Sequence, residues 1–214
     1  MKHPMRKWWM IIFCGVVALK ANAQAGYKPV ADVAAVKQQF AKTAQSTQSI
    51  ESDFVQEKEL SMLSDKITSK GKFWFKKDNK VRMEYSTPSY YLLVINGKDI
   101  KTKDSQKENR VSAKSNKAFE QVNKLTVDCV QGTVLDNADF SSRILENGTT
   151  YLLELTPVNK ALKDFFKTIS LTVDKKDYGV TKIVMQENSG DNTSISFVHK
   201  QVNVNIPDAV FAIK

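Results

Sequence analysis

Gly71–Lys98 reads GKFWFKKDNKVRMEYSTPSYYLLVINGK, and this stretch decides the fold. Asp78-Asn79 and Ser86-Thr87-Pro88 separate three runs rich in apolar residues, and Asn96-Gly97, a strong hairpin signal, closes the last run. In the first two runs apolar and polar residues alternate, so one face of each strand is apolar. The stretch therefore predicts an antiparallel meander whose apolar face needs a covering layer or a bound ligand.

The alternation also predicts which side chains share a face of this meander. One side is expected to carry Phe73, Phe75, Val81, Met83 and Tyr85, and the other Lys72, Trp74, Arg82 and Glu84.

The rest of the chain predicts a helical layer and more strands. Residues 32–47 favour an amphipathic helix that Asp32 caps, with Val33, Val36, Phe40 and Ala44 on one face. Other strands are expected at 50–60, 67–75, 142–146, 151–156, 169–173, 180–187 and 193–200. Polar residues 101–117 predict a loop, 118–125 and 127–135 short helices, and 160–167 a connection with Leu162, Phe165 and Phe166 packed inward. About ten antiparallel strands with a helical cover make an α+β fold.

Residues 1–23 have the pattern of a cleaved signal peptide. A basic start precedes a short apolar run at 8–19, and Ala21-Asn22-Ala23 is a small-x-small cleavage site. An uncleaved membrane anchor is the alternative, but the apolar run is short for a bilayer span. We expect residues 24–214 to form a single exported domain.

The charge pattern argues against a nucleic-acid-binding protein. Of the formal net charge of +9, four charges lie within residues 1–23. Lysines elsewhere mix with acids, and outside residues 1–23 the arginines are only Arg82, Arg110 and Arg143. The remaining basic bias suits transient contact with an anionic membrane.

Catalytic patterns are absent from the sequence. There is no metal-binding histidine motif, no nucleophile elbow and no glycine-rich phosphate loop. His199 and Cys129 are a possible base and nucleophile, but a solvent-facing strand histidine and a buried cysteine are the simpler interpretations. We expect a protein that is not an enzyme.

Apolar residues at alternating strand positions are the main candidate site. They fit either an ordinary core beneath the helices or the wall of a lipid-sized pocket, for which methionine is well suited. The candidates for acyl-chain binding are Phe40, Phe73, Phe75, Val81, Met83, Tyr85, Leu92, Val94, Leu153, Leu155, Leu171, Ile183, Met185, Ile195 and Phe197.

Several spaced motifs resemble those of one protein family. They are the Gly71–Lys98 block, Phe54-Val55-Gln56, and the closing pattern of Asp191–Phe197, an asparagine at 203 or 205, Ile206-Pro207-Asp208 and Phe211. Together they resemble the LolA family of periplasmic outer-membrane lipoprotein carriers, over roughly residues 30–213.

The resemblance implies a strongly curved, unclosed β-barrel with a helical lid over an apolar cavity. It implies a periplasmic monomer that takes acylated lipoproteins from an inner-membrane ABC complex to an outer-membrane acceptor, with no cofactor. The family commonly has Arg-Pro after the aromatic strand, and that arginine helps hold the lid closed. This chain has Lys77-Asp78 there, so Lys77 and Arg82 are the candidates for lid control.

Two alternatives remain at this point. A related fold serves as a lipid- or protein-sensing domain in envelope-stress signalling. An enzyme acting on lipid is the other alternative, and loss of activity on changing His199 would support it.

Overall fold

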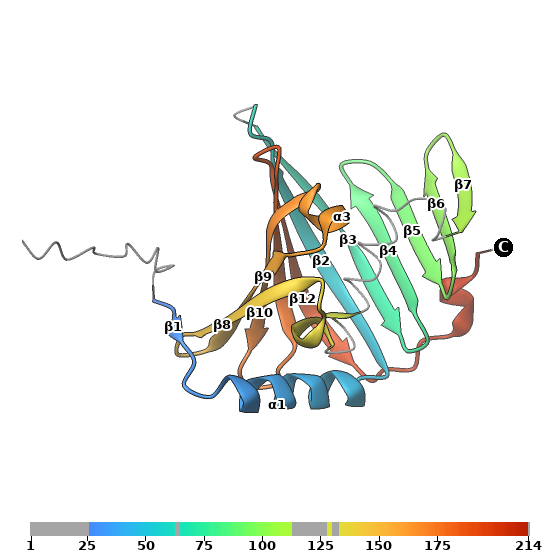
Figure 1. The fold of residues 1–214 in the computed structure, drawn as a ribbon. Coiled ribbons are helices and arrows are strands. Elements are labelled where there is room, and N and C mark those ends of the chain that lie inside the picture. The colour runs from blue at the N-terminus through green and yellow to red at the C-terminus, as the bar shows by residue number, and fades with distance from the viewer. Residues whose placement is uncertain (1–25, 63–64, 113–127, 130–132, 214) are drawn as a thin grey trace, which may run out of the picture.

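A single twelve-stranded antiparallel sheet dominates the computed structural model, which describes residues 26–62, 65–112, 128–129 and 133–213. The strand order is β1-β8-β9-β10-β11-β12-β2-β3-β4-β5-β6-β7, so the sheet has two open edges (Figure 1). The predicted class, an unclosed antiparallel barrel with helices, is confirmed, with slightly more strands than expected. The strands are β1 (Lys28–Pro29), β2 (Ser49–Glu59), β3 (Lys66–Lys76), β4 (Lys80–Thr87), β5 (Tyr91–Asn96), β6 (Asp99–Asp104), β7 (Glu108–Ser112), β8 (Phe140–Glu146), β9 (Thr150–Pro157), β10 (Phe166–Asp174), β11 (Val180–Glu187) and β12 (Asn192–Val202).

The predicted meander is β3–β4–β5. Phe73 pairs with Met83 and Phe75 with Val81, so these four side chains share the concave face as expected. Asp78 and Asn79 have φ of 70° and 57°, the left-handed conformation that a tight hairpin between twisted strands needs. At the bulge where β3 meets β4, a Cβ on Gly71 would lie 2.1 Å from the carbonyl oxygen of Glu84.

The loop predicted at residues 101–117 is wrong over its first part, which forms β6 and β7. Ile100 is fully buried and pairs with Ile95, and Glu108 accepts ion pairs from Lys101 at 3.3 Å and Arg110 at 2.7 Å. A buried apolar anchor, one ion pair between the strands and one within β7 support this sheet edge, where a charged surface also discourages pairing with another chain.

Helix α1 (Val33–Ser46) lies across one end of the sheet (Figure 1). Asp32 caps it by accepting a hydrogen bond from the Ala35 amide at 2.9 Å. Val36, Phe40 and Ala44 are buried as predicted, whereas Val33 is 44% exposed. The other described helices are short: α3 (Lys160–Lys163) and the 3₁₀ helices η2 (Val134–Asp136) and η3 (Asp208–Phe211).

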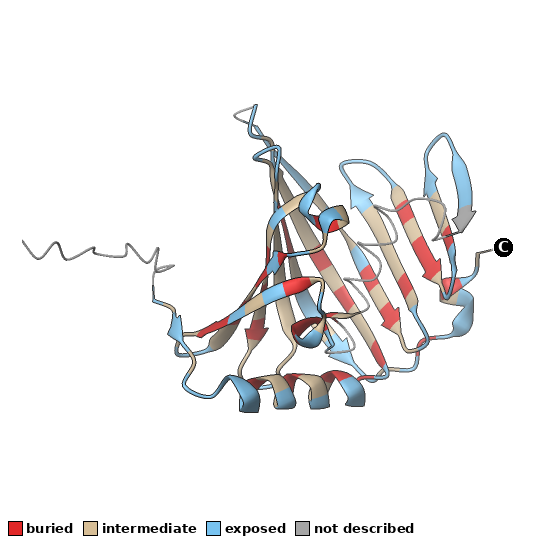
Figure 2. Ribbon diagram, in the orientation of Figure 1, coloured by how far each residue is buried: buried red, intermediate tan, exposed pale blue. Residues whose placement is uncertain are grey.

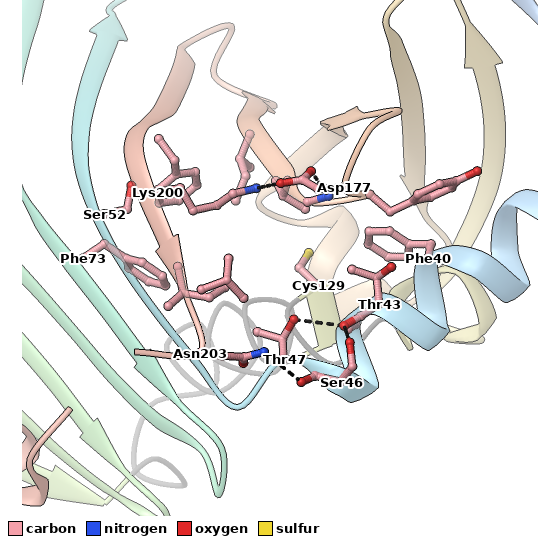
Figure 3. A pocket seen from close by; sticks show the side chains of 18 of the residues that line it. Phe40, Thr43, Ser46, Thr47, Ser52, Phe73, Cys129, Asp177, Lys200 and Asn203 are labelled. Atoms are coloured by element: carbon pink, nitrogen blue, oxygen red, sulfur yellow. Dashed lines mark hydrogen bonds and ion pairs between the residues drawn. The ribbon is translucent and has the colours of Figure 1, made fainter. Parts of the chain in front are cut away.

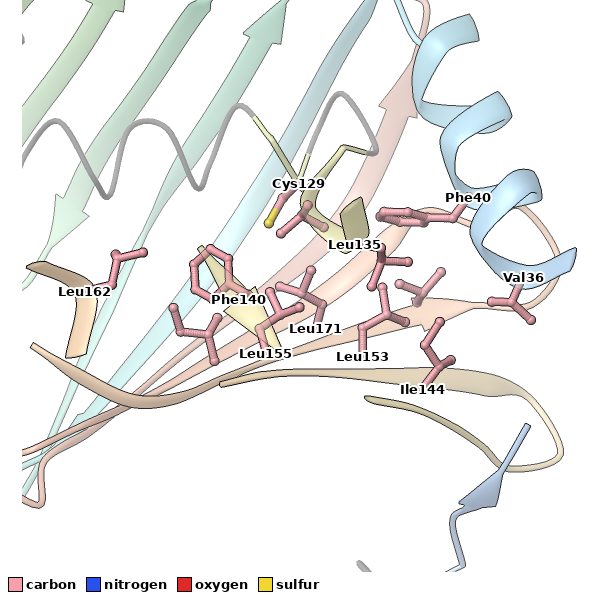
Figure 4. Close-up of a cluster of buried hydrophobic side chains, with 13 residues drawn as sticks. Val36, Phe40, Cys129, Leu135, Phe140, Ile144, Leu153, Leu155, Leu162 and Leu171 are labelled. Atoms are coloured by element: carbon pink, nitrogen blue, oxygen red, sulfur yellow. The ribbon is translucent and has the colours of Figure 1, made fainter. Parts of the chain in front are cut away.

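Two apolar clusters share the concave face, and a third lies on the convex face. Figure 2 shows that buried residues occur in α1 and in strands of both halves of the sheet. The first packs α1, Leu135 and Leu162 against the inward side chains of β8–β10 (Figure 4). The second joins Phe54 to the inward residues of β3–β6 and β12. Phe165 is expected to pack inward, but it is 46% exposed, and Phe166 packs against the first cluster in its place. A register shift between Phe166 and Thr168 breaks the alternation that runs back from the inward Ile169.

The third cluster holds the C-terminal segment, residues 203–213, against the outside of the meander. Ile206 and Phe211 pack there on Leu92, Val94 and Trp74. The predicted signal peptide at 1–23, the predicted helix at 118–125 and part of the one at 127–135 lie outside the described residues. Among the described helices, none is both long and apolar enough for a membrane span.

Candidate functional site

A cavity of about 370 Å³ lies between α1 and the concave face of the sheet (Figure 3). Its apolar wall comes from both layers and from Cys129, which precedes η2. This volume is at the small end of the range typical of small-molecule sites. The described lining residues are Phe40, Thr43, Ala44, Ser46, Thr47, Ile50, Ser52, Phe73, Met83, Cys129, Asp177, Tyr178, Gly179, Val180, Ile183, Ile195, Phe197, Lys200, Val202 and Asn203.

Some of the predicted acyl-chain residues line this cavity. The register brings them together, because Phe73 opposes Met83 and Ile183 opposes Ile195 across neighbouring strands. Phe197 also contacts Phe73, with ring centroids 5.2 Å apart. The predicted residues in the lining are Phe40, Phe73, Met83, Ile183, Ile195 and Phe197.

Other predicted residues share the concave face but fill the core beside the cavity. Tyr85 donates a hydrogen bond to Gln56 at 2.9 Å, and burial raises the pKa of its phenol to about 12. Met185 packs between the two concave clusters. The remaining members of this group are almost fully buried: Phe75, Val81, Leu153, Leu155 and Leu171.

The prediction that Leu92 and Val94 face the cavity is wrong. Leu92 pairs with Glu84 and Val94 with Arg82, so both point to the convex face and pack beneath the C-terminal segment. An almost wholly apolar strand is buried on both faces. Its composition therefore does not indicate which of its alternating side chains point toward a ligand.

The polar part of the lining was missed by the sequence analysis. Lys200 Nζ lies 3.1 Å from Asp177 Oδ2, and both side chains line the cavity together with Phe40 of α1 (Figure 3). Burial opposes ionisation of Asp177, but the Gly179 amide and the Lys200 ammonium outweigh it, so the pKa of Asp177 is lowered. Strict alternation from Phe197 would place Lys200 on the outer face of β12, so no sequence signal marked it as part of the lining.

Lys77 directly follows β3 and lies next to the last turn of α1. Its Nζ donates to the Gln45 carbonyl oxygen at 2.6 Å, and its amide donates to the Gln48 carbonyl at 2.9 Å. The helix therefore ends with a cation on one of its exposed carbonyls, which the helix dipole favours.

Arg82, the other candidate for lid control, lies on the convex face. It donates to the Val210 carbonyl at 3.0 Å and to Glu84 at 2.7 Å, and it stacks 5.6 Å from the centre of the Trp74 ring. These contacts hold the C-terminal segment and do not reach α1.

The described residues offer little for catalysis. They contain no cluster of three potential metal ligands. Burial raises the pKa of the Cys129 thiol, so it stays protonated and is a poor nucleophile. The His199 side chain is 81% exposed and contacts Asp53 at 3.0 Å on the outer face.

Comparisons with known proteins agree with this architecture. The family model described as outer membrane lipoprotein carrier protein LolA matches residues 45–214. A search of the curated proteins found no matching sequence.

Solved structures share the fold at low sequence identity. An uncharacterized conserved protein from Thermus thermophilus has a TM-score of 0.52 and 10% identity, covering 83% of this chain and 90% of that chain. A LolA superfamily protein from Nitrosomonas europaea has a TM-score of 0.46 and 12% identity, covering 83% and 96%. A putative outer membrane lipoprotein-sorting protein domain from Vibrio parahaemolyticus has a TM-score of 0.48 and 11% identity, covering 83% and 94%.

Proposed function

The chain belongs to the LolA family of outer membrane lipoprotein carrier proteins, and from this membership we propose that it carries acylated lipoproteins across the periplasm. The observation that carries the proposal is the apolar cavity between α1 and the concave face. Its wall combines aromatic, aliphatic and thioether side chains, which accept a flexible hydrocarbon chain without demanding one shape.

The physical task explains why such a cavity is needed. Exposing an acyl chain to water costs about 0.8 kcal/mol per methylene, so a lipoprotein anchor needs a cover outside the membrane. A cavity of about 370 Å³ is small for a three-chain anchor. Loading therefore requires α1 to move away from the sheet, and α1 acts as the lid.

Lys77 is the proposed latch for this lid. Its bond to the Gln45 carbonyl joins the sheet to α1 and must break when the helix swings out. A second link, from Lys37 Nζ to the Leu135 carbonyl at 2.8 Å, joins the middle of α1 to η2.

The proposed location and partners are inferred from the family and from the predicted signal peptide. The proposed mature domain is 24–214, a periplasmic monomer that touches membranes only transiently. An inner-membrane ABC complex loads it and an outer-membrane acceptor unloads it. The carrier needs no cofactor and performs no hydrolysis itself.

A transfer assay with two neighbouring substitutions tests the proposal. Ile183→Glu places a charge in the cavity, whereas Val184→Glu places it on the opposite face of β11, and both side chains are half-buried. The purified protein is incubated with inner-membrane vesicles that contain the ABC complex and a triacylated lipoprotein, and the soluble complex is measured. We expect Ile183→Glu to abolish the complex and Val184→Glu to retain it.

Two results would contradict the carrier role. One is a wild-type protein that never yields a soluble lipoprotein complex. The other is mass spectrometry of protein from its native periplasm that finds free lipid and no lipoprotein, which would favour a lipid-sensing domain of the same fold.

A further inference from the structure

One extra residue in β12 turns Lys200 toward the cavity. Phe197 pairs with Phe54 and Val202 with Ile50, so five steps along β12 match four along β2. His199 takes the extra place with φ of 54°. A β-bulge with one residue in the left-handed conformation reverses the face of the side chains that follow.

The two residues at the bulge end up on opposite faces. The His199 side chain is 81% exposed and contacts Asp53, an outward residue of β2, at 3.0 Å. The Lys200 side chain is only 15% exposed and lines the cavity. The bulge thus places an ammonium in a mostly apolar wall.

The Lys200 ammonium has more N–H donors than its ion pair with Asp177 uses. An ammonium carries three N–H groups, and its one ion pair among the described residues is with Asp177 at 3.1 Å. Asp177 is 54% exposed and lies nearer the solvent, so a ligand inside the cavity meets the ammonium first. Gly179 makes room for it, because a Cβ there would lie 2.0 Å from Lys200 Nζ.

Apolar side chains surround this cation in the lining. Ile195 and Phe197 precede Lys200 in β12 and Val202 follows it, and all four line the cavity. Asn203 and Thr47 lie apart from Lys200, near the C-terminal end of α1 (Figure 3). An apolar cavity with one cation in its described lining is complementary to an amphiphile with an acidic head.

We propose that the cavity binds a long-chain carboxylate, with Lys200 on the head group and the wall around Phe73, Ile195 and Phe197 on the hydrocarbon chain. The inference rests on the proposed function, because the hydrocarbon chain must enter the same cavity. The cavity should prefer an amphiphile with an ionised head group over a neutral amphiphile of equal chain length. A hydrogen bond to a charged group contributes enough to set that preference on the order of tenfold.

Displacement of an uncharged dye tests this preference. N-phenyl-1-naphthylamine is bound to the protein at pH 8 and displaced by hexadecanoate or by hexadecanol, each below its aggregation limit. We expect hexadecanoate to bind about tenfold more tightly than hexadecanol. Lys200→Met should remove the difference and Lys200→Arg should keep most of it.

Two further variants separate a head-group contact from a general effect of charge. Asp177→Asn frees the ammonium from its partner, so hexadecanoate should bind more tightly than to the wild type, with hexadecanol unchanged. Lys182→Met, on the outer face of β11, is the matched control and should leave both ligands unchanged.

The outcomes distinguish this inference from the carrier proposal. Equal binding of both ligands, or an undiminished preference in Lys200→Met, would overturn the carboxylate site while leaving the cavity able to hold acyl chains. If neither ligand displaces the dye, the cavity binds no chain and the proposed function fails together with the inference.

Discussion

The ammonium of Lys77 donates to the backbone carbonyl of Gln45 at 2.6 Å, joining the end of β3 to the last turn of α1. This contact links the sheet to the proposed lid. A lysine keeps the charge but not the planar, multi-donor fork of arginine, so the link depends on one flexible donor.

Lys77→Leu should weaken the closed state of the lid. A hydrogen bond from a charged donor contributes about 1.5–3 kcal/mol, so the lid equilibrium should shift by about ten- to a hundredfold. We expect the protein to remain folded and cargo release to change more than cargo uptake, measured as lipoprotein transfer to acceptor membranes. Lys77→Arg keeps a charged donor at this position and should release cargo as the wild type does.

Arg82→Leu is the control for the Lys77 experiment. Arg82 holds the Val210 carbonyl and Glu84 on the convex face, so its loss should reduce the free energy of unfolding without a specific effect on release. If Lys77→Leu leaves release unchanged, or if Arg82→Leu alters it as strongly, Lys77 is not the latch.

Gly71→Ala should destabilise the protein through a backbone clash. A Cβ there would meet the Glu84 carbonyl oxygen at 2.1 Å and the Phe54 ring at 2.8 Å, and neither neighbour can move freely. Forced overpacking of this kind costs about 1–3 kcal/mol, which denaturant unfolding would detect. Gly148→Ala, in a turn with open space around its Cβ position, should be neutral. Equal stabilities of the two variants would contradict the prediction.

Strand alternation predicted the meander and most of the concave face from the sequence. Phe73 and Met83 share a face because the Asp78-Asn79 turn fixes the register between β3 and β4. Helix α1 was also predicted from the sequence, because the spacing of its apolar residues and the Asp32 cap both indicate a helix that begins there.

The errors have two physical sources. Leu92 and Val94 lie in a strand buried on both faces, where the side that faces a cavity depends on a C-terminal segment more than a hundred residues away in the chain. Lys200 was missed because a one-residue bulge reverses which side chains of β12 face inward. Nothing in the sequence Phe197-Val198-His199-Lys200 predicts a residue in the left-handed conformation. Tertiary pairing, not local composition, decides both cases.

Ala44→Phe should fill the cavity from the lid side. Ala44 lines the cavity from α1 and is 9% exposed, so a larger side chain there takes space that a ligand would use. We expect binding of an uncharged hydrophobic dye to weaken at least about tenfold, the equivalent of about 1.4 kcal/mol. Ala34→Phe, on the exposed face of the same helix, should bind dye as the wild type does. Equal dye binding by both variants would place the dye site elsewhere.

Acid should loosen the C-terminal segment through Asp208. Its carboxylate accepts hydrogen bonds from Lys76 at 2.7 Å and Lys80 at 3.1 Å, and these bonds and charges lower its pKa below the usual 3.8. A lowered pKa means that this contribution to stability is present above the ordinary aspartate pKa and is lost as pH falls through the lowered value.

Trp74 reports on this step, because it packs against the segment and is the only tryptophan outside residues 1–23. Quenching of Trp74 by acrylamide should rise below about pH 3.8, while Asp208→Asn should show the raised quenching already at pH 7. Asp164→Asn, an exposed carboxyl beside α3, should behave as the wild type at both pH values. A ligand in the cavity should not alter the quenching, since Trp74 lies on the opposite face of the sheet from Phe73. If Asp208→Asn matches the wild type at pH 7, the two lysines do not hold the segment through Asp208, and the apolar contacts of Ile206 and Phe211 suffice.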